Sequence, residues 1–460
     1  MQTNWLWGYL IPIGILLLTW GGLPPHKARR ITPLAALALA LAVLGYWLVG
    51  YAFHLGGAHF VNLDDPTLAG LDALYAHDLK WGLVGMTGFA LLGDEVTPTA
   101  LSLFLAYLPL ISSAVLLLVL ALAEARRWLV IAAGALAGAV VVPVAACWVW
   151  GSGWLAHLGE TLSLGHGFAD FGGSGLLLWL PAMMATGILL FQPRRSVEEP
   201  ITPPPAYFPL LANLGALLLG IGWVGWSLSG PFHTYGATLD WNRAALSVFL
   251  GMAGAVLTSQ LYAWLVTGDI EPLMAARGMA AGWGAALAGA VFLPPWAALI
   301  VGLIAGLLFP LVLYGVEVGL RLKDSAAVVA LGVVGGFWGL LSVGLLADGR
   351  WGQGWNGSGA ETSLGVTGLF TGGGSGQLLA QLVGLLALGL WGLLWGALLG
   401  GISRLTLPRA RPTPAAELAE EREEAVSGDE EEKEDEEAET QPEIMPESET
   451  VSENMPPPTA

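Results

Sequence analysis

Long apolar runs alternate with polar or glycine- and proline-rich connections through most of this chain of 460 residues. Eleven runs have roughly the 20 residues that an α-helix needs to cross the hydrocarbon core of a bilayer. The predicted spans are 4–23, 31–53, 97–121, 128–150, 172–193, 206–228, 242–267, 277–293, 295–320, 325–347 and 375–403. The pattern predicts an all-α polytopic membrane protein.

The first run, and the junction of the eighth and ninth runs, each allow two interpretations. The run at 4–23 has no basic segment before it and no small-x-small cleavage site after it, so we expect a membrane helix rather than a cleaved signal peptide. The eighth and ninth spans meet at Leu293-Pro294-Pro295 and form either two short helices or one broken helix.

Lysine and arginine are concentrated in alternate connections. One set carries Lys27, Arg29, Arg30, Arg126, Arg127, Arg194, Arg195, Arg277, Arg321, Lys323, Arg404, Arg409 and Arg411. The opposite set carries Lys80, Arg243 and Arg350. The positive-inside rule then predicts an N-terminus outside the cell and a cytoplasmic C-terminus, which agrees with an odd number of spans in a plasma membrane.

Composition divides the chain into two parts. Overall, 55% of residues are hydrophobic and 12% charged, with a mean hydropathy of +0.65. Residues 413–460 hold 18 of the 36 acidic residues but only two basic ones, so they carry −16 of the net charge of −18. We expect a membrane domain at 1–404 and an acidic, disordered cytoplasmic tail at 405–460. A regulatory tail stays open, although no motif identifies a partner protein.

The same composition excludes several function classes. With the acidic tail removed, the remaining chain offers no large charged surface for a nucleic acid. Its single cysteine, Cys147, permits no internal disulfide. The sequence has no His/Cys/carboxylate metal cluster, nucleophile elbow or phosphate loop, so we expect neither an enzyme nor a bound cofactor.

Seven short segments, in order along the chain, resemble the Amt/Mep/Rh ammonium transporter family. They are WLVGYAF at 47–53, AEAR at 123–126, WGSG at 150–153, ADFGG at 169–173, GWVGW at 222–226, KD at 323–324 with GG at 335–336, and GVTGLF at 365–370 with QL at 377–378. The resemblance implies eleven membrane helices, with an inverted repeat of helices 1–5 and 6–10. It also implies a homotrimer with one pore for ammonium or ammonia in each subunit.

The chain departs from the family at the centre of that pore. The family places one histidine on the fifth helix and one on the tenth, each eight residues after an aspartate. Here those positions are Leu178 and Gly332, counted from Asp170 and Asp324. The seven histidines are His26 on the cytoplasmic side and His54, His59, His77, His157, His166 and His233 in or beside outer loops. We therefore expect Leu178 and Gly332 to face one another in a dry, apolar stretch of the pore.

The outer vestibule implied by the resemblance has two candidate residues. Trp150 matches the family's Trp-Gly-x-Gly and would attract a cation to its indole face, although a tryptophan at a helix end is also a common interfacial anchor. The family's outer-site serine falls on Gly230, and a slip of one residue supplies Ser229. For the aromatic gate, the third helix offers Tyr107, Leu108 and Leu110.

Asp170 and Asp324 precede the fifth and tenth predicted helices. A buried carboxylate needs partners, and at a helix start it can accept hydrogen bonds from backbone N–H groups. We expect a capping role for both, with indirect stabilisation of a passing cation as the alternative.

Three functions remain compatible with the sequence. An apolar pore without the histidines would pass neutral ammonia rather than the ion. The chain could instead be a non-transporting ammonium sensor or scaffold, or a channel for another small neutral molecule such as CO2.

Overall fold

The computed structural model describes residues 3–60, 66–76, 80–93, 97–151, 153–195, 207–228, 239–357 and 364–406. Residues Met1–Leu405 pack as one compact unit, and Thr406–Ala460 form a second unit of which the structure describes Thr406. The predicted acidic tail therefore lies outside the described residues and stays a prediction.

The first half of the bundle contains eight α-helices and a short hairpin among the described residues. The helices are α1 (Leu10–Gly22), α2 (Pro25–Gly45), α3 (Tyr51–Leu55), α4 (Pro98–Ala121), α5 (Arg127–Leu136), α6 (Val142–Trp150), α7 (Leu158–Leu162) and α8 (Leu180–Leu189). Strands β1 (Leu74–Ala76) and β2 (Gly82–Gly85) pair antiparallel. The hairpin lies in the long connection between α3 and α4.

The second half contains the remaining α-helices. They are α9 (Pro209–Ser227), α10 (Trp241–Thr267), α11 (Pro272–Leu287), α12 (Pro295–Tyr314), α13 (Val328–Leu331), α14 (Gly339–Leu346) and α15 (Gly376–Leu405). Residues 288–294 separate α11 from α12, so the chain at Leu293-Pro294-Pro295 forms two helices. Proline explains the break because it lacks the N–H that would continue the helix.

Five π-helical segments extend α-helices into longer rods. They are η2 (Tyr46–Gly50), η6 (Ala137–Val141), η7 (Ser174–Trp179), η9 (Gly315–Gly319) and η10 (Gly332–Trp338). Three of them, η2, η6 and η10, join two α-helices. Each of the five adds a wider turn, and such turns occur frequently at functional sites. Two of them, η7 and η10, pack against each other inside the bundle.

The predicted all-α membrane fold is confirmed, and each of the eleven predicted spans overlaps a helical segment. Among the described residues, nine helical segments are long and apolar enough to cross a membrane, and Ser174–Leu189 is a shorter apolar one. The eighth span is displaced, because its helix begins at Pro272 and ends at Leu287 rather than covering 277–293. The chain is therefore a multi-pass membrane protein.

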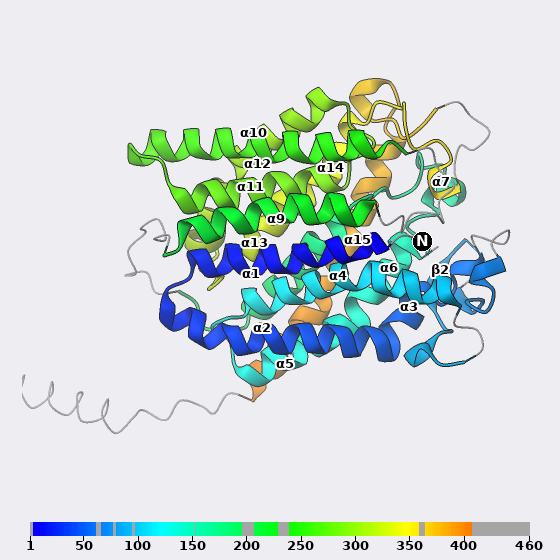
Figure 1. Ribbon diagram of the computed structural model, residues 1–460, viewed down its shortest axis with the longest axis horizontal. Coiled ribbons are helices and arrows are strands. Elements are labelled where there is room, and N and C mark those ends of the chain that lie inside the picture. The colour runs from blue at the N-terminus through cyan, green and yellow to red at the C-terminus, as the bar shows by residue number, and fades with distance from the viewer. Residues whose placement is uncertain are drawn as a thin grey trace, which may run out of the picture. The chain divides into compact units, whose positions relative to one another are not determined.

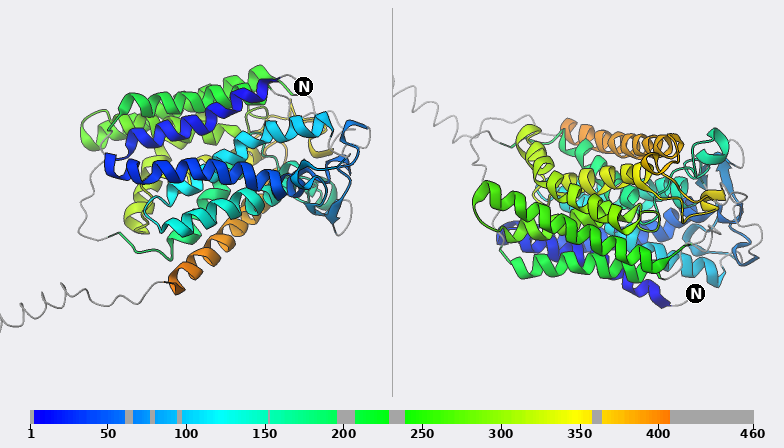
Figure 2. Two further views of the ribbon diagram at one scale, coloured as in Figure 1. Left: turned by 60° about the horizontal axis from the view of Figure 1, so that its bottom comes forward. Right: turned by 90° about the horizontal axis from the view of Figure 1, so that it is seen from above.

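The long helices of this unit run side by side along one direction, as the labels α1, α2, α9 and α10 show in Figure 1. Figure 2 shows α15 crossing this direction obliquely, and α15 packs on α8. The two halves meet where α1 packs on α9. A Cβ atom on Gly14 would lie 2.6 Å from the carbonyl oxygen of Gly215, so glycine permits this close approach.

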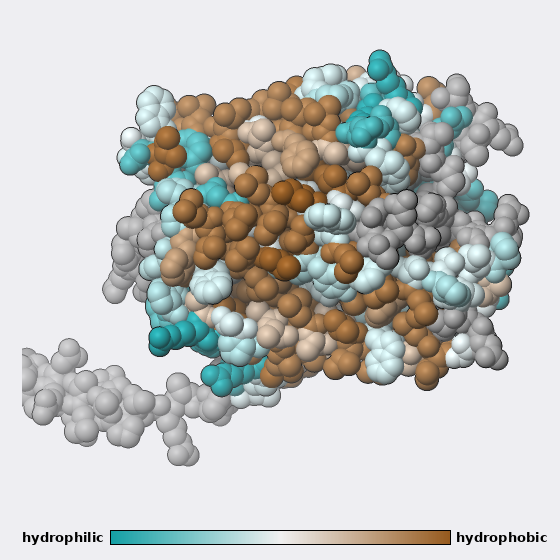
Figure 3. Space-filling model, viewed as in Figure 1, coloured by the Kyte–Doolittle hydropathy of each residue, from teal (hydrophilic) through white to brown (hydrophobic). Residues whose placement is uncertain are grey.

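Apolar side chains cover the middle of the face shown in Figure 3, and hydrophilic ones gather toward its ends. On α9 and α10, Leu210 is 85% exposed and Leu257 65% exposed. Such exposed leucines are the expected surface of a helix that contacts lipid. We refer below to the two ends of the bundle as the Trp150 end and the Asp324 end.

Candidate functional site

Asp170 is a fully buried carboxylate whose hydrogen bonds go to the start of the following helix. Its Oδ1 accepts from the backbone N–H of Gly173 at 3.1 Å, and its Oδ2 accepts from Gly175 at 2.9 Å and Leu176 at 3.3 Å. Gly173 has a φ of 91°, which glycine adopts without the penalty of a side chain. The geometry is that of a carboxylate holding the N-terminal N–H groups of η7.

Asp324 occupies the matching position before α13. Its Oδ2 accepts from the backbone N–H of Val329, five residues ahead, just as Asp170 accepts from Gly175. Ala327, three residues after Asp324, has a φ of 57°. The two helix starts therefore share a carboxylate and, three residues later, a left-handed residue, which fits the inverted repeat of a transporter.

Trp150 ends α6 inside a cluster of rings rather than at the lipid surface. It is 3% exposed, and its Nε1 donates to the backbone carbonyl of Asp170 at 2.8 Å. The ring of Tyr107 lies 5.4 Å from it, and the ring of Trp226 lies 6.4 Å from Tyr107. Together with His54, these residues form what we call the aromatic wall. Burial favours the wall interpretation of Trp150 over the interfacial anchor.

His54 belongs to this wall although the sequence placed it in or beside an outer loop. It lies in the last turn of α3, but its imidazole is fully buried. The centroid of the ring is 4.8 Å from that of Tyr107 and 6.4 Å from that of Trp150. Helical spacing in the sequence could have indicated this burial. Tyr46 and Tyr51 precede His54 by eight and three residues, so they share its helix face.

Leu178 and Gly332 lie in direct contact where η7 meets η10. A Cβ atom on Gly332 would lie 2.7 Å from the carbonyl oxygen of Leu178 and would collide with the Cβ of Ala182. The Leu178 side chain is 1% exposed and extends between Gly284 and Gly335. A Cβ atom on Gly335 would lie 2.8 Å from Cδ1 of Leu178. Leu178 therefore fills the space beside Gly284 and Gly335 with methyl groups, whereas its backbone carbonyl and the Cβ of Ala182 leave no room for a side chain at Gly332.

Two glutamines of α15 hold the loop that leads to Asp170. Gln381 accepts from the N–H of Ala169 at 2.8 Å and donates to its carbonyl at 2.7 Å. Gln377 accepts from the N–H of His166 and donates to the carbonyl of Gly167, both at 2.9 Å. These buried amides replace the hydrogen bonds that an irregular backbone would otherwise lose inside a membrane protein.

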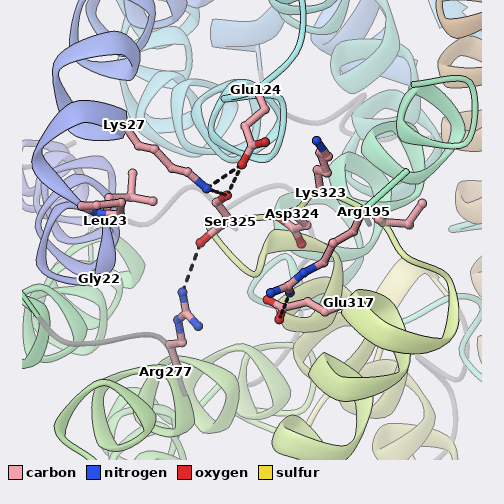
Figure 4. Close-up of a pocket in the computed structure, with 12 residues that line it drawn as sticks. Gly22, Leu23, Lys27, Glu124, Arg195, Arg277, Glu317, Lys323, Asp324 and Ser325 are labelled. Atoms are coloured by element: carbon pink, nitrogen blue, oxygen red, sulfur yellow. Dashed lines mark hydrogen bonds and ion pairs between the residues drawn. The ribbon is translucent and has the colours of Figure 1, made fainter. Parts of the chain in front are cut away.

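A charged pocket of about 250 Å³ lies at the opposite end of the bundle. It is lined by the cationic side chains Lys27, Arg195, Arg277 and Lys323 and by the carboxylates Glu124, Glu317 and Asp324, with Ser325 among them (Figure 4). The carboxylate Oδ1 of Asp324 is buried and has no hydrogen-bond partner among the described residues. Asp324 therefore lies between the start of α13 and the charged pocket.

Ion pairs organise this pocket. Lys27 lies 2.7 Å from Glu124, and both side chains bond to the hydroxyl of Ser325, as Figure 4 shows. Arg195 pairs with Glu317 at 3.1 Å. Burial opposes the charge on Glu124, but the hydrogen bonds from Lys27 and Ser325 prevail and lower the pKa of its carboxyl. Glu124 is therefore ionised at neutral pH.

Ser229 lies outside the described residues, so its predicted place in the vestibule stays a prediction. In the part of the chain that the structure describes, no group of three or more His, Cys, Asp or Glu side chains could hold a metal ion.

Comparison with known proteins gives consistent matches. The sequence model of the Ammonium Transporter Family matches residues 7–420. The chain is 27% identical over 283 residues to the ammonium transporter Amt2 of Archaeoglobus fulgidus, which covers 59% of each protein. It is 28% identical over 276 residues to ammonium transporter 3 of Dictyostelium discoideum, covering 58% of this chain and 60% of that protein. With ammonium transporter 1 member 3 of Solanum lycopersicum it shares 26% identity over 411 residues, covering 83% and 82%.

Solved structures match over most of the chain. A structure described as a sensor Amt protein has a TM-score of 0.69 at 21% identity, covering 90% of this chain and 95% of that chain. Mep2 of Candida albicans has a TM-score of 0.69 at 20% identity, covering 91% and 87%. At these identities the likeness concerns the fold.

Proposed function

Because the chain belongs to the ammonium transporter family, we propose that it moves ammonium or ammonia across a plasma membrane. The path we propose starts at the aromatic wall, passes Leu178 and Gly332, and ends in the charged pocket beside Asp324. The observation that carries this proposal is the pair of carboxylate-held helix starts at Asp170 and Asp324. Helices that start inside a transporter at equivalent points of two repeats commonly flank its substrate path.

The chemistry of the three regions suits a neutral substrate. An indole face attracts a cation by about 0.5–2 kcal/mol, so the wall at Trp150 would concentrate ammonium. Beyond it, the methyl groups of Leu178 and the bare backbone of Gly332 cannot replace the water that an ion loses. The path would therefore exclude the ion and accept ammonia, provided that Leu178 moves from between Gly284 and Gly335.

Uptake into proteoliposomes tests the proposal, with two tryptophans of α6 as a matched pair. Trp150 and Trp148 each donate their Nε1 to a backbone carbonyl, of Asp170 and of Leu83. Only Trp150 belongs to the aromatic wall. We expect Trp150→Ala to lower ammonium uptake about tenfold at subsaturating concentration, because the cation–π attraction is lost. Trp148→Ala should keep uptake near wild type. Equal losses in the two variants would argue against the wall as the substrate site.

A non-transporting ammonium sensor is the second candidate. The contact of Gly332 with Leu178 favours it, because that contact closes the route between η7 and η10. The discriminating result is specific ammonium binding by the purified protein without uptake into proteoliposomes. Uptake of CO2 with none of ammonia would instead support a channel for another neutral molecule.

We further propose that the N-terminus lies outside the cell and that the protein assembles as a homotrimer with one path per subunit. The cations Lys27, Arg195, Arg277 and Lys323 support this orientation because they gather at the Asp324 end. A Phe60→Cys variant should react with an impermeant thiol reagent added outside, and Arg195→Cys should not. Wild type serves as the control, because Cys147 is buried. The reverse labelling would overturn the orientation, and native mass spectrometry tests the trimer.

A further inference from the structure

His54 places a polar atom in the aromatic wall that the proposed path leaves unused. Its Nδ1 lies 2.9 Å from the hydroxyl oxygen of Tyr46, and the imidazole is fully buried. Its Nε2 is buried and has no hydrogen-bond partner in the part of the chain that the structure describes. A buried polar nitrogen left unpaired is costly, so an occupant that satisfies it is expected to bind there.

The hydrogen bond with Tyr46 indicates which tautomer His54 adopts. Among the described residues, Nδ1 of His54 is the hydrogen-bond partner recorded for the Tyr46 hydroxyl. If Nδ1 carried the proton, the phenol hydrogen would be left without an acceptor in a dry site, since Tyr46 is itself fully buried. The Tyr46 O–H therefore donates to Nδ1, and the proton of the neutral imidazole resides on Nε2.

The free Nε2–H lies beside the rings of the aromatic wall. The two nitrogens of an imidazole point away from each other, so Nε2 faces away from the Tyr46 hydroxyl. The other rings recorded beside His54 are those of Tyr107 at 4.8 Å and Trp150 at 6.4 Å. The indole N–H of Trp150 is already bonded to the carbonyl of Asp170, so it does not compete for an acceptor.

We propose that His54 binds the neutral form of the substrate, by donating its Nε2–H to the lone pair of ammonia. The ammonium ion has four N–H groups and no lone pair, so it cannot accept this hydrogen bond. The ring faces of the wall attract the ion, whereas His54 selects the molecule that has already lost its proton to external water. This inference rests on the proposed function and assigns the form of the substrate bound at its first site.

Binding to the purified full-length protein in detergent tests the inference without requiring transport. Titration calorimetry with ammonium chloride at constant ionic strength, from pH 6 to pH 8, gives the apparent Kd for total ammonium. His54→Leu shares every other titratable group with wild type, so the difference between the two isolates the binding that depends on His54. The apparent Kd of that binding should fall about tenfold per pH unit as the ammonia fraction rises. An apparent Kd that is independent of pH and the same in wild type and His54→Leu would show that only the ion binds, at the ring faces, and would overturn the inference.

Three variants at position 54 isolate the donor. His54→Leu removes both nitrogens and should weaken binding about tenfold. If that variant does not fold, His54→Gln and His54→Asn supply the comparison. Glutamine keeps an N–H near the place of Nε2, so binding should persist. Asparagine reaches only the place of Nδ1, so binding should be lost. Equal affinities for the glutamine and asparagine variants would contradict the proposed donor.

His166 offers a matched control. Its Nε2 is also buried and without a hydrogen-bond partner among the described residues, and none of the ring contacts recorded for the wall involves it. His166→Leu should leave the apparent Kd and its pH dependence unchanged. If His166→Leu weakens binding as much as His54→Leu, the effect is one of general packing and the inference fails. If the wild-type protein binds ammonia as described but shows no uptake in proteoliposomes, the inference stands and the transport proposal fails.

Discussion

Asp170 and Asp324 lie at equivalent helix starts, yet their carboxylates accept different sets of hydrogen bonds. Both oxygens of Asp170 accept backbone N–H groups, and the residue three positions later is a glycine. At Asp324 the Oδ1 has no hydrogen-bond partner among the described residues, and the left-handed residue is Ala327. Asp324 also lines the charged pocket, whereas Asp170 is enclosed behind Trp150. Both halves of the repeat therefore have a carboxylate at this position. Asp170 is fully hydrogen-bonded and stabilises its helix start, whereas Asp324 keeps one oxygen without a recorded partner, in the described part of the chain, beside the charged pocket.

Replacing each aspartate by alanine should show the largest difference between the two helix starts. Asp170→Ala orphans three buried N–H groups, so we expect a loss of about 2–4 kcal/mol in unfolding free energy. Asp324→Ala should lose about 1 kcal/mol, because among the described residues only Oδ2 of Asp324 is bonded, to backbone N–H groups at the start of α13. Thermal unfolding in detergent measures both. Asp240→Ala is the control, since Asp240 caps α10 at a partly exposed site. Wild-type stability in both aspartate variants, with transport lost, would contradict capping and favour a direct substrate role.

Exchanging the left-handed residues tests the same comparison at the backbone. Gly173→Ala forces a side chain into a φ of 91° and brings its Cβ to 3.2 Å from Cη2 of Trp150. We expect destabilisation by about 1–2 kcal/mol. Ala327→Gly relieves the corresponding strain at a φ of 57°, offset by the greater freedom of glycine in the unfolded chain, for a net gain of about 0.5 kcal/mol. Opposite signs in the two melting temperatures are expected, and two losses would show that Ala327 is not strained.

The smallest effect concerns the charge of Asp324, in the connection between η9 and α13. Burial raises the pKa of its carboxyl from 3.8 to about 6, although the N–H groups of Val329 and Val328 oppose the rise. The folded state then binds the proton more tightly than the unfolded state does. The stability of wild type relative to Asp324→Asn should therefore fall as pH rises from about 4 to about 6, and level off above that range. A relative stability that rises over this window would mean that the pKa is lowered instead.

The sequence predicted the helices far better than the contacts inside the bundle. Each of the eleven spans predicted from apolar length overlaps a helical segment, although the eighth is displaced. The offset of eight residues from Asp170 and Asp324, which the family resemblance supplied, singled out Leu178 and Gly332, and these two residues lie in contact. The sequence could not predict the π-helical turns of η7 and η10, because they depend on how the two helices pack. Nor did it indicate that Leu178 fills the space beside Gly284, a residue more than a hundred positions away on α11.

The candidate site shows the same limit. Trp150 and both aspartates were identified from local pattern, but His54 was assigned by its neighbours in the chain rather than by its helix face. Its burial comes from Tyr107 on α4 and Trp150 on α6, which contact it across the bundle. The burial of a polar residue near a predicted loop is therefore better predicted from the helix face that it shares with aromatic residues than from its neighbours in the chain.

We propose that the path between Trp150 and Asp324 passes no charge, because Leu178 and Gly332 offer methyl groups and backbone where an ion would need ligands. Recording current and uptake together from proteoliposomes that contain the full chain tests it most directly. Addition of ammonium should produce uptake of ammonia that increases with external pH, with no accompanying current. A clear inward current on adding ammonium would show that charge crosses this region and would contradict the account.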